Sequence, residues 1–325
     1  MATIKDIADE AGISCAAVSR ILNHKGSFNA ETISRVEKIA RKLNYKPVSL
    51  LQQEDQKNNR IIAAIFPSIE IPYFGLLTSL LEKCVYDYGY QLMLCGSVFD
   101  RVKEEECFKK LKDGKLSGVL LGSYTFDSAS VENENLPIVT IGYKLCDNIP
   151  SVSSDNYSAG RIAAKHLISK GCKKFLYITS YVGNLELDLR YQGFKSELSG
   201  FELNIYAVTM EMQIENDFSS VITQMVLEHP DADAIFAETD SLAMNCIQVY
   251  SCLGYDIPKD IKIIGYGYPF FSAFSNPKLT LIKENTKEIT KRAVDMLVNI
   301  IENDSLLNSK GEVVVPVSIM ENRTT

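Results

Sequence analysis

The sequence predicts an α/β protein in which a small helical domain precedes two doubly wound parallel sheets. Residues 1–47 hold three short segments with the apolar spacing of helices. From residue 61 onward, apolar runs of strand length alternate with amphipathic segments, which is typical of parallel sheets with right-handed crossovers. The alternation falls into two sets of similar size, and 325 residues exceed one average domain. We therefore expect a helical domain, a linker and two lobes.

The first two helices are predicted within residues 3–23. The apolar residues of the first follow the spacing i, i+3, i+4 and i+7 and so share one face; they are Ile4, Ile7, Ala8 and Ala11. Gly12 can form the turn, and Ser14 stands where an N-cap hydroxyl would bond the free N–H groups of the second helix. The second helix buries Val18, Ile21 and Leu22. Its other face presents Cys15, Ala16, Ser19, Arg20 and Asn23.

A third helix is predicted to begin after Asn29, a favoured capping residue. Its inward face consists of Ile33, Val36, Ala40 and Leu43. Helix, glycine turn, helix and supporting helix make a helix-turn-helix domain, whose second helix enters the major groove of DNA. The alternative is a three-helix cap that binds no nucleic acid.

Charge and composition agree with a DNA-binding head on an acidic body. Residues 1–60 contain ten Lys and Arg and seven Asp and Glu, a net charge of +3; the remainder contains 24 and 34, a net of −10, and the sum is −7. With no signal-peptide core and no apolar run of about 18 residues, a cytoplasmic location without membrane contact is expected. Eight scattered cysteines and three isolated histidines predict free thiols, no metal and no cofactor. Nucleotide-binding and hydrolase motifs are absent, which argues against an enzyme.

Residues 48–60 are polar and predict a linker whose first turn could become helical. The first set beyond it has strands at 61–66, 91–95, 118–122 and 138–142 and helices near 73–88 and at 102–112. The second set has helices at 157–169, 187–199, 217–228 and 240–252 and strands at 174–179, 204–209, 234–238 and 261–266. Since ligands of such folds bind at the carboxyl ends of strands, we expect a ligand site between the lobes.

Four ordered motifs resemble the opening of LacI/GalR-type regulators: TIKDIA at 3–8, AGIS at 11–14, VSRILN at 18–23 and LNYKP at 43–47. The similarity continues along the whole chain. Within the family it is greatest to sucrose- and ribose-operon repressors of Gram-positive bacteria, through IFPSI at 65–69, NIPSVSSDN at 148–156 and GRIAAKHL at 160–167.

The resemblance implies a helix-turn-helix domain at 1–47, a hinge at 48–60 and a periplasmic-binding-protein-like sensor at 61–325 that carries effector binding and dimerisation. The chain of such a sensor crosses between its lobes three times. Lobe one would contain 61–156 and 286–308. Lobe two would contain 157–285 and 309–325, so that VVVPVSIM at 313–320 ends in lobe two.

On the DNA side, Cys15 and Ala16 would lie nearest the base edges, where small side chains suit a thymine methyl. Arg20 is long enough for a guanine edge or a phosphate. Phosphate contacts that fix register are expected from Thr3, Ser14, Ser19 and Asn23. The alternatives are that Cys15 only fills the helix and that Arg20 is a solvated charge.

The resemblance also exposes two departures. Ala17 stands where the family usually has Thr. In the hinge, the family places a Leu in the minor groove, but Glu54 occupies that position, and a carboxylate is costly to insert between bases. Either Leu50 or Leu51 forms the wedge in a shifted register, with Leu51 favoured, or the central base step stays closed.

On the ligand side, the resemblance implies that Tyr73, Phe74 and Phe218 stack on a sugar ring. Asp155 would accept from two hydroxyls and Arg190 would donate to them, with Thr239 and Asp240 completing the site. The alternatives are core packing for the aromatic residues and an interlobe salt bridge for Asp155 and Arg190.

A further departure concerns the residue after IGY, where the family often has Asp against sugar hydroxyls. This chain has Gly267, and Tyr266 or Tyr268 would fill the space. The ligand's identity, a small sugar or a sugar phosphate, therefore stays open.

These features predict a repressor of a carbohydrate-utilisation operon, released from a palindromic operator in double-stranded DNA by its effector. A palindrome needs two DNA-binding domains, so a homodimer is expected, and the chain has no C-terminal heptad helix for a tetramer. A corepressor response, in which the ligand tightens DNA binding, is open because sequence does not fix the sign of coupling. A sugar-binding protein without a DNA role is the other alternative.

Overall fold

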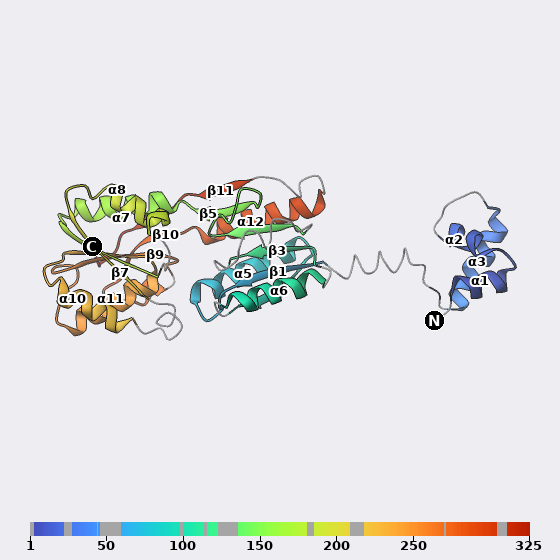
Figure 1. Cartoon of the computed structure of the whole chain (residues 1–325), viewed down its shortest axis with the longest axis horizontal. Coiled ribbons are helices and arrows are strands. Elements are labelled where there is room, and N and C mark those ends of the chain that lie inside the picture. Colours follow the sequence, from blue (N-terminus) through green and yellow to red (C-terminus); the bar gives the residue numbers. More distant parts are fainter. Residues whose placement is uncertain are drawn as a thin grey trace. The chain divides into compact units, whose positions relative to one another are not determined.

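A computed structural model of the chain divides into two compact units, Met1–Arg60 and Ile61–Thr325 (Figure 1). The residues that the structure describes are 3–22, 28–43, 45, 60–97, 100–113, 116–122, 136–180, 185–208, 218–269, 271–303 and 311–325. No helix among them is long and apolar enough to cross a membrane.

The smaller unit is the predicted three-helix domain. Its helices are α1 (Ile4–Ala11), α2 (Cys15–Leu22) and α3 (Ala30–Lys42). The predicted apolar faces meet in one core, in which Ile7, Val18 and Val36 are fully buried. Gly12 ends α1 in the left-handed conformation, at φ +66°, which glycine adopts without strain. The predicted caps are confirmed: Ser14 Oγ accepts from the N–H of Ala17 at 3.2 Å, and Asn29 Oδ1 accepts from the N–H of Thr32 at 2.7 Å.

The larger unit contains two six-stranded sheets, one in each lobe. The first sheet has the order β11 (Glu312–Val315), β5 (Ser151–Ser154), β4 (Ile138–Ile141), β3 (Gly118–Leu121), β1 (Ile61–Phe66) and β2 (Gln91–Gly96). The second has the order β12 (Ser318–Met320), β10 (Thr280–Lys283), β9 (Lys262–Gly267), β8 (Ala234–Ala237), β6 (Lys174–Thr179) and β7 (Glu202–Ala207). Every pairing is parallel except that of β12 with β10. The predicted fold class, a pair of doubly wound parallel sheets, is confirmed.

Helices cover the faces of both sheets. In lobe two, α7 (Asn156–Ser169) and α8 (Leu189–Ser196) lie on one face, and α10 (Ser219–Glu228) and α11 (Asp240–Cys252) on the other (Figure 1). In lobe one, α5 (Pro72–Asp87) and α12 (Thr286–Glu302) pack against one apolar face of the sheet, and α6 (Arg101–Asp113) contributes Phe108 to the core on the other. Short 3-10 turns occur at Leu185–Leu187 and Phe271–Ala273.

The chain crosses between the lobes three times, after β5, after β10 and after β11. As the resemblance implied, α12 returns to lobe one, where it packs on α5 and the sheet. The predicted third crossing at 309 is wrong. Residues 312–315 belong to lobe one, because β11 pairs in parallel with β5, Glu312 opposite Ser151, and so completes the edge of the first sheet. Of the described residues after 309, β12 and the terminal segment that follows it lie in lobe two.

Candidate DNA-binding and ligand-binding sites

The second helix of the N-terminal domain exposes the side that was predicted to meet DNA. Cys15, Ala16 and Arg20 are exposed on α2, and Ser19 is partly buried, while Val18 and Ile21 hold the helix to the core. A short helix with small residues at its start and a long cation one turn later can enter a groove and reach base edges.

Thr3 has a structural role that sequence analysis did not assign. Its hydroxyl caps α1 by accepting from the N–H of Asp6 at 3.3 Å, and Asp6 Oδ2 accepts in return from the N–H of Thr3 at 2.7 Å. This capping box also lowers the pKa of Asp6, because both Thr3 donors favour the ionised carboxylate. The predicted DNA contacts Asn23 and Leu51 lie outside the described residues.

In the sensor, Arg190 is the centre of a polar group where strands of the second sheet end. The first turn of α8 carries it, and Asp188 caps that helix by accepting from the N–H of Arg190 at 2.9 Å. The guanidinium donates to the backbone oxygen of Glu238 at 2.6 Å and to Asn156 Oδ1 at 2.8 Å. It also lies 3.6 Å above the ring of Tyr266, a cation–π contact. Its Nε is buried and has no hydrogen-bond partner among the described residues.

Glu238 follows β8 and joins two strand ends. One of its carboxylate oxygens accepts from Thr179 Oγ1 at 2.5 Å, from the N–H of Ser180 at 2.6 Å and from Ser180 Oγ at 3.0 Å. The other lies 3.9 Å from Arg190. Beside them, burial and the charge of Glu238 raise the pKa of Asp188.

Glu284, at the second crossing, connects the lobes. Its buried carboxylate accepts from Ser154 Oγ of lobe one at 3.0 Å and from Tyr266 Oη of lobe two at 2.8 Å. Thr286, at the start of α12, donates to the other oxygen at 3.1 Å. The ring of Tyr266 also contacts the guanidinium of Arg190. Arg190 is therefore connected, through Tyr266 and Glu284, to the crossing between the lobes.

Asp240 occupies the space beside Gly267 that sequence analysis assigned to a tyrosine. A Cβ built on Gly267 would lie 3.4 Å from the carboxyl carbon of Asp240. Burial, and after it the charge of Glu284, raises the pKa of Asp240 to about 6, although the N–H of Ser241 donates to it at 2.8 Å. We call Asp188, Arg190, Glu238, Asp240, Tyr266 and Glu284 the interlobe cluster.

Two other predicted ligand residues cap the helices next to this cluster. Asp155 Oδ1 accepts from the N–H of Ser158 at 2.9 Å at the start of α7, and Thr239 Oγ1 accepts from the N–H of Leu242 at 3.1 Å at the start of α11. Both therefore have a structural role whether or not they contact a ligand. Asn156, rather than Asp155, bonds Arg190, so the structure does not show the predicted alternative of an Asp155–Arg190 salt bridge.

The predicted stacking aromatics are less available. Phe74 is 6% exposed and stacks on Phe66 at 5.3 Å between ring centroids, and Phe218 is 4% exposed in the core under α10. In this conformation the core-packing alternative holds for both. Tyr73 is only partly buried and packs edge-on against Phe74. Sequence analysis missed Glu238 and Glu284, because Glu238 bonds Thr179, 59 positions away, and Glu284 bonds Ser154, 130 positions away.

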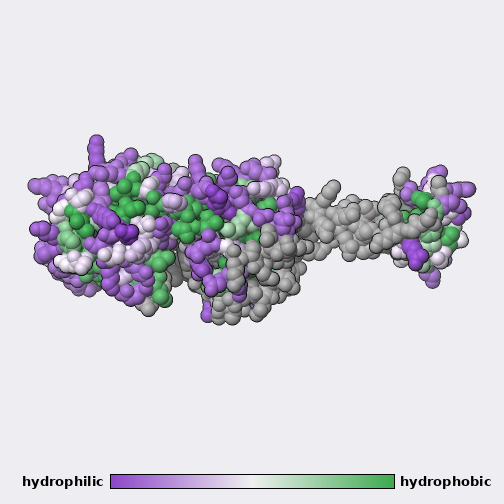
Figure 2. Space-filling model, turned by 90° about the horizontal axis from the view of Figure 1, so that it is seen from above, coloured by the Kyte–Doolittle hydropathy of each residue, from purple (hydrophilic) through white to green (hydrophobic). Residues whose placement is uncertain are grey.

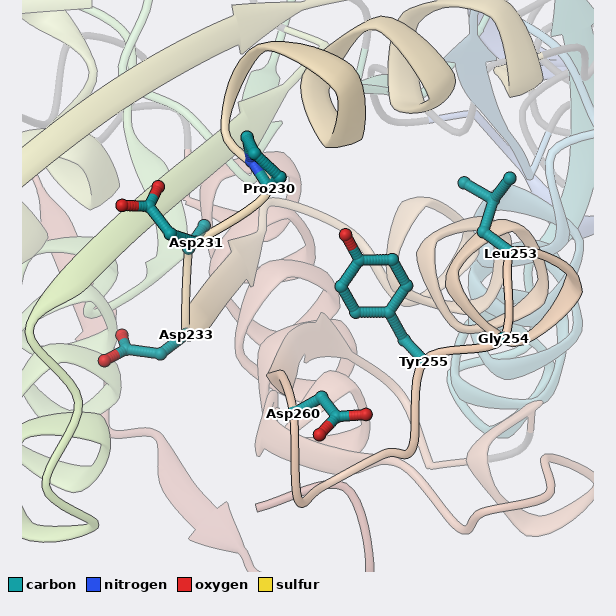
Figure 3. A pocket seen from close by; sticks show the side chains of 8 residues that line it. Pro230, Asp231, Asp233, Leu253, Gly254, Tyr255 and Asp260 are labelled. Carbon is teal, nitrogen blue, oxygen red and sulfur yellow. The ribbon is translucent and has the colours of Figure 1, made fainter.

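A surface depression of about 430 Å³ lies elsewhere in lobe two, at the amino ends of β8 and β9. Figure 3 shows Tyr255 across it from Asp231 and Asp233, with Asp260 below. Ligands of doubly wound folds bind at the opposite, carboxyl ends.

The surface of the larger unit is mainly hydrophilic in the view of Figure 2, with hydrophobic patches between the polar areas.

A helix-turn-helix domain followed in one chain by two parallel-sheet lobes defines a class of DNA-binding transcriptional regulator. The model of bacterial regulatory proteins of the lacI family matches residues 3–48, and that of the periplasmic binding protein-like domain matches 164–325. The sucrose operon repressor of Streptococcus mutans is 31% identical, over 98% of both chains, and the ribose operon repressor of Halalkalibacterium halodurans is 30% identical over 100% of this chain and 97% of its own. The chain belongs to the lacI family of transcriptional repressors.

Solved structures agree on the fold. A periplasmic binding protein/LacI transcriptional regulator from Alkaliphilus metalliredigens, complexed with D-xylulofuranose, is 27% identical with a TM-score of 0.73 and covers 82% of this chain and 99% of its own. The lac repressor dimer bound to operator and the anti-inducer ONPF is 21% identical, with a TM-score of 0.70, and covers 100% of this chain and 99% of its own.

Proposed function

We propose that this protein is a homodimeric repressor of a carbohydrate-utilisation operon, which a small sugar or sugar phosphate releases from a palindromic operator. The observation that carries the proposal is the Arg190 network. Its guanidinium keeps an unpartnered buried Nε, a donor that a ligand oxygen would satisfy, and contacts the tyrosine that bonds the interlobe crossing.

The mechanism is a shift between conformations. A ligand that bonds groups of both lobes favours the arrangement in which they approach, and it can move the equilibrium only by its difference in affinity for the two arrangements. In the dimer, a change between lobes alters the spacing of the two DNA-binding domains, so that both half-sites are no longer held together. Relatives named for sucrose and ribose operons support a sugar as the effector.

The proposal is tested by footprinting the purified protein on its own upstream DNA, with and without sugars. We expect one protected palindrome, weaker binding with added salt at a log–log slope of about −0.9 per neutralised phosphate, and release by one sugar. Arg190→Lys should retain operator binding but lose that release, because the single nitrogen of an ammonium cannot occupy the separate positions from which the guanidinium donates to Glu238, to Asn156 and to a ligand. Absence of any protected site would contradict the proposal. Protection that appears only with sugar would show that the ligand tightens operator binding, the opposite of the release proposed here.

A further inference from the structure

The interlobe cluster is rich in carboxylates. Asp188 and Glu238 act directly on the guanidinium of Arg190, whereas Glu284 is joined to it through Tyr266, and Asp240 is coupled to Glu284. Full ionisation of these four carboxylates gives the cluster four negative charges against the one positive charge of Arg190, a net of −3. These groups act on one another: Glu238 on Asp188, and Glu284 on Asp240. Two of the four, Asp188 and Asp240, have raised pKa values, for which burial is the first cause and these neighbouring charges a further one.

The one cation is already engaged. Arginine binds phosphate through two parallel N–H donors. Here each terminal nitrogen of Arg190 donates to a protein oxygen, the backbone of Glu238 or the side chain of Asn156, and only Nε is unpartnered among the described residues. The free Nε–H of Arg190 can donate to one hydroxyl oxygen of a ligand. It would leave most of the negative charge of a phosphate dianion without a compensating donor.

Arg190 is the one cation that the cluster contains; Lys283, which ends β10 next to Glu284, is exposed. Two cations that follow strands of lobe one are paired with carboxylates: Arg101 with Glu105 at 3.0 Å, and Lys144 with Asp147 at 2.8 Å.

Asp240 is the carboxylate with the most freedom to meet a ligand. Glu238 accepts three hydrogen bonds and Glu284 three, whereas one backbone N–H from the adjacent Ser241 reaches Asp240 in the described structure. Gly267 beside it has φ +142° and no side chain, so the carboxylate lies against bare backbone.

We infer that the interlobe cluster accepts an uncharged, polyhydroxylated ligand and rejects its phosphate ester, and that Asp240, seated against Gly267, enforces the choice. The inference rests on the proposed function and narrows its ligand class. Sugar hydroxyls can donate to the carboxylates and accept from Arg190 Nε, whereas a phosphate would add two negative charges to a partly dry site that already carries an excess of them.

The test uses the full-length protein and matched pairs of neutral and phosphorylated probes: sucrose and sucrose 6-phosphate, D-ribose and D-ribose 5-phosphate, D-fructose and D-fructose 6-phosphate. Thermal shift identifies the pair that binds, and calorimetry at pH 7.5 gives both dissociation constants. We expect the neutral member to bind about 100-fold more tightly than its ester. Asp240→Asn should reduce that ratio about tenfold or more.

Asp256→Asn is the matched control, since it removes the same charge from lobe two at an exposed loop beyond the far end of α11. It should leave the ratio unchanged. A phosphate ester that binds as tightly as its parent sugar overturns the inference but leaves the proposed function standing. If no probe of either kind binds, both the inference and the proposed sugar effector are contradicted. If Asp240→Asn behaves like Asp256→Asn, the choice is not made by Asp240.

Discussion

At the scale of single residues, burial of the Asp240 carboxylate lowers the stability of the folded protein. Burial raises its pKa to about 6, whereas the unfolded chain has a value near 3.9. The folded protein therefore binds this proton more tightly, and the free energy of unfolding falls as the pH rises from about 4 to about 6 and stays low above. A buried carboxylate that lowers stability is a candidate functional group, which agrees with the ligand role proposed for Asp240.

We therefore expect Asp240→Asn to raise the melting temperature at pH 7.5. Two pKa units correspond to about 2–3 kcal/mol, or a shift of roughly 4–10 °C, and partial exposure makes this an upper bound. Asn keeps an oxygen that accepts from Ser241. The gain should disappear at pH 4, where Asp240 is largely protonated. Calorimetric scans at both pH values check this, and equal gains at both would contradict a charge effect.

At the scale of elements, the recognition helix was the most predictable part of the chain. Its caps, its buried face and its exposed face all follow from residues within about ten positions, which is why α2 appears as expected. Its exposed side chains are the ones that sequence analysis predicts to contact DNA.

Arg20→Ala should weaken specific operator binding by about 1–3 kcal/mol if the guanidinium contacts a guanine edge. Non-specific binding should change far less. If Arg20 contacts phosphate, affinity should fall equally on all sequences and the salt slope should decrease by about one. Titrations of operator and scrambled DNA at several salt concentrations distinguish these outcomes. No change on either DNA would assign Arg20 as a solvated charge.

Helices α7 and α8 lie in direct backbone contact, because each has a glycine at the crossing. A Cβ on Gly160 would stand 2.0 Å from the backbone oxygen of Arg190, and one on Gly193 would stand 2.0 Å from that of Tyr157. This close approach sets the position of α8 and therefore of Arg190.

Gly160→Ala should accordingly destabilise the sensor by about 3 kcal/mol or more, since backbone atoms cannot move aside as a side chain would. Gly75→Ala is the control: it also lies within a helix, α5, but its Cβ would make an ordinary contact at 3.5 Å. There the better helix propensity of Ala should stabilise by up to about 1 kcal/mol. Urea denaturation of both variants measures the difference, and similar effects would refute the packing account.

At the scale of the whole molecule, the lobes are joined by three crossings and by the buried hydrogen bonds of Glu284. Ser154, Tyr266 and Thr286 lie in three different elements, and their hydroxyls converge on this one carboxylate. Both carboxylate oxygens of Glu284 only accept hydrogen bonds, so together they satisfy the three hydroxyl donors. A glutamine amide has only one accepting oxygen and cannot do the same.

Glu284→Gln should therefore lower the free energy of unfolding of the sensor by about 1–3 kcal/mol, because a buried donor loses its acceptor. It should also weaken the response of operator affinity to sugar, since the interlobe contact is altered. Glu288→Gln, which removes an exposed pair with Arg292 on the same helix, should change little. Denaturation and operator titration test both variants. Equal effects of Glu284→Gln and Glu288→Gln would contradict a role of Glu284 in connecting the lobes.

The sequence by itself determined the helix-turn-helix domain, most strands and helices of both lobes, and Arg190 and Asp240 as ligand candidates. Caps, apolar periods and family motifs are local, and local interactions suffice for them. Only the tertiary structure decided that β11 completes lobe one, that Phe74 and Phe218 are buried, and that Glu238 and Glu284 organise the site. These depend on partners far away in the chain: serine-rich β5 becomes a buried strand, and a glutamate becomes a link between lobes, only when the whole chain has folded around it.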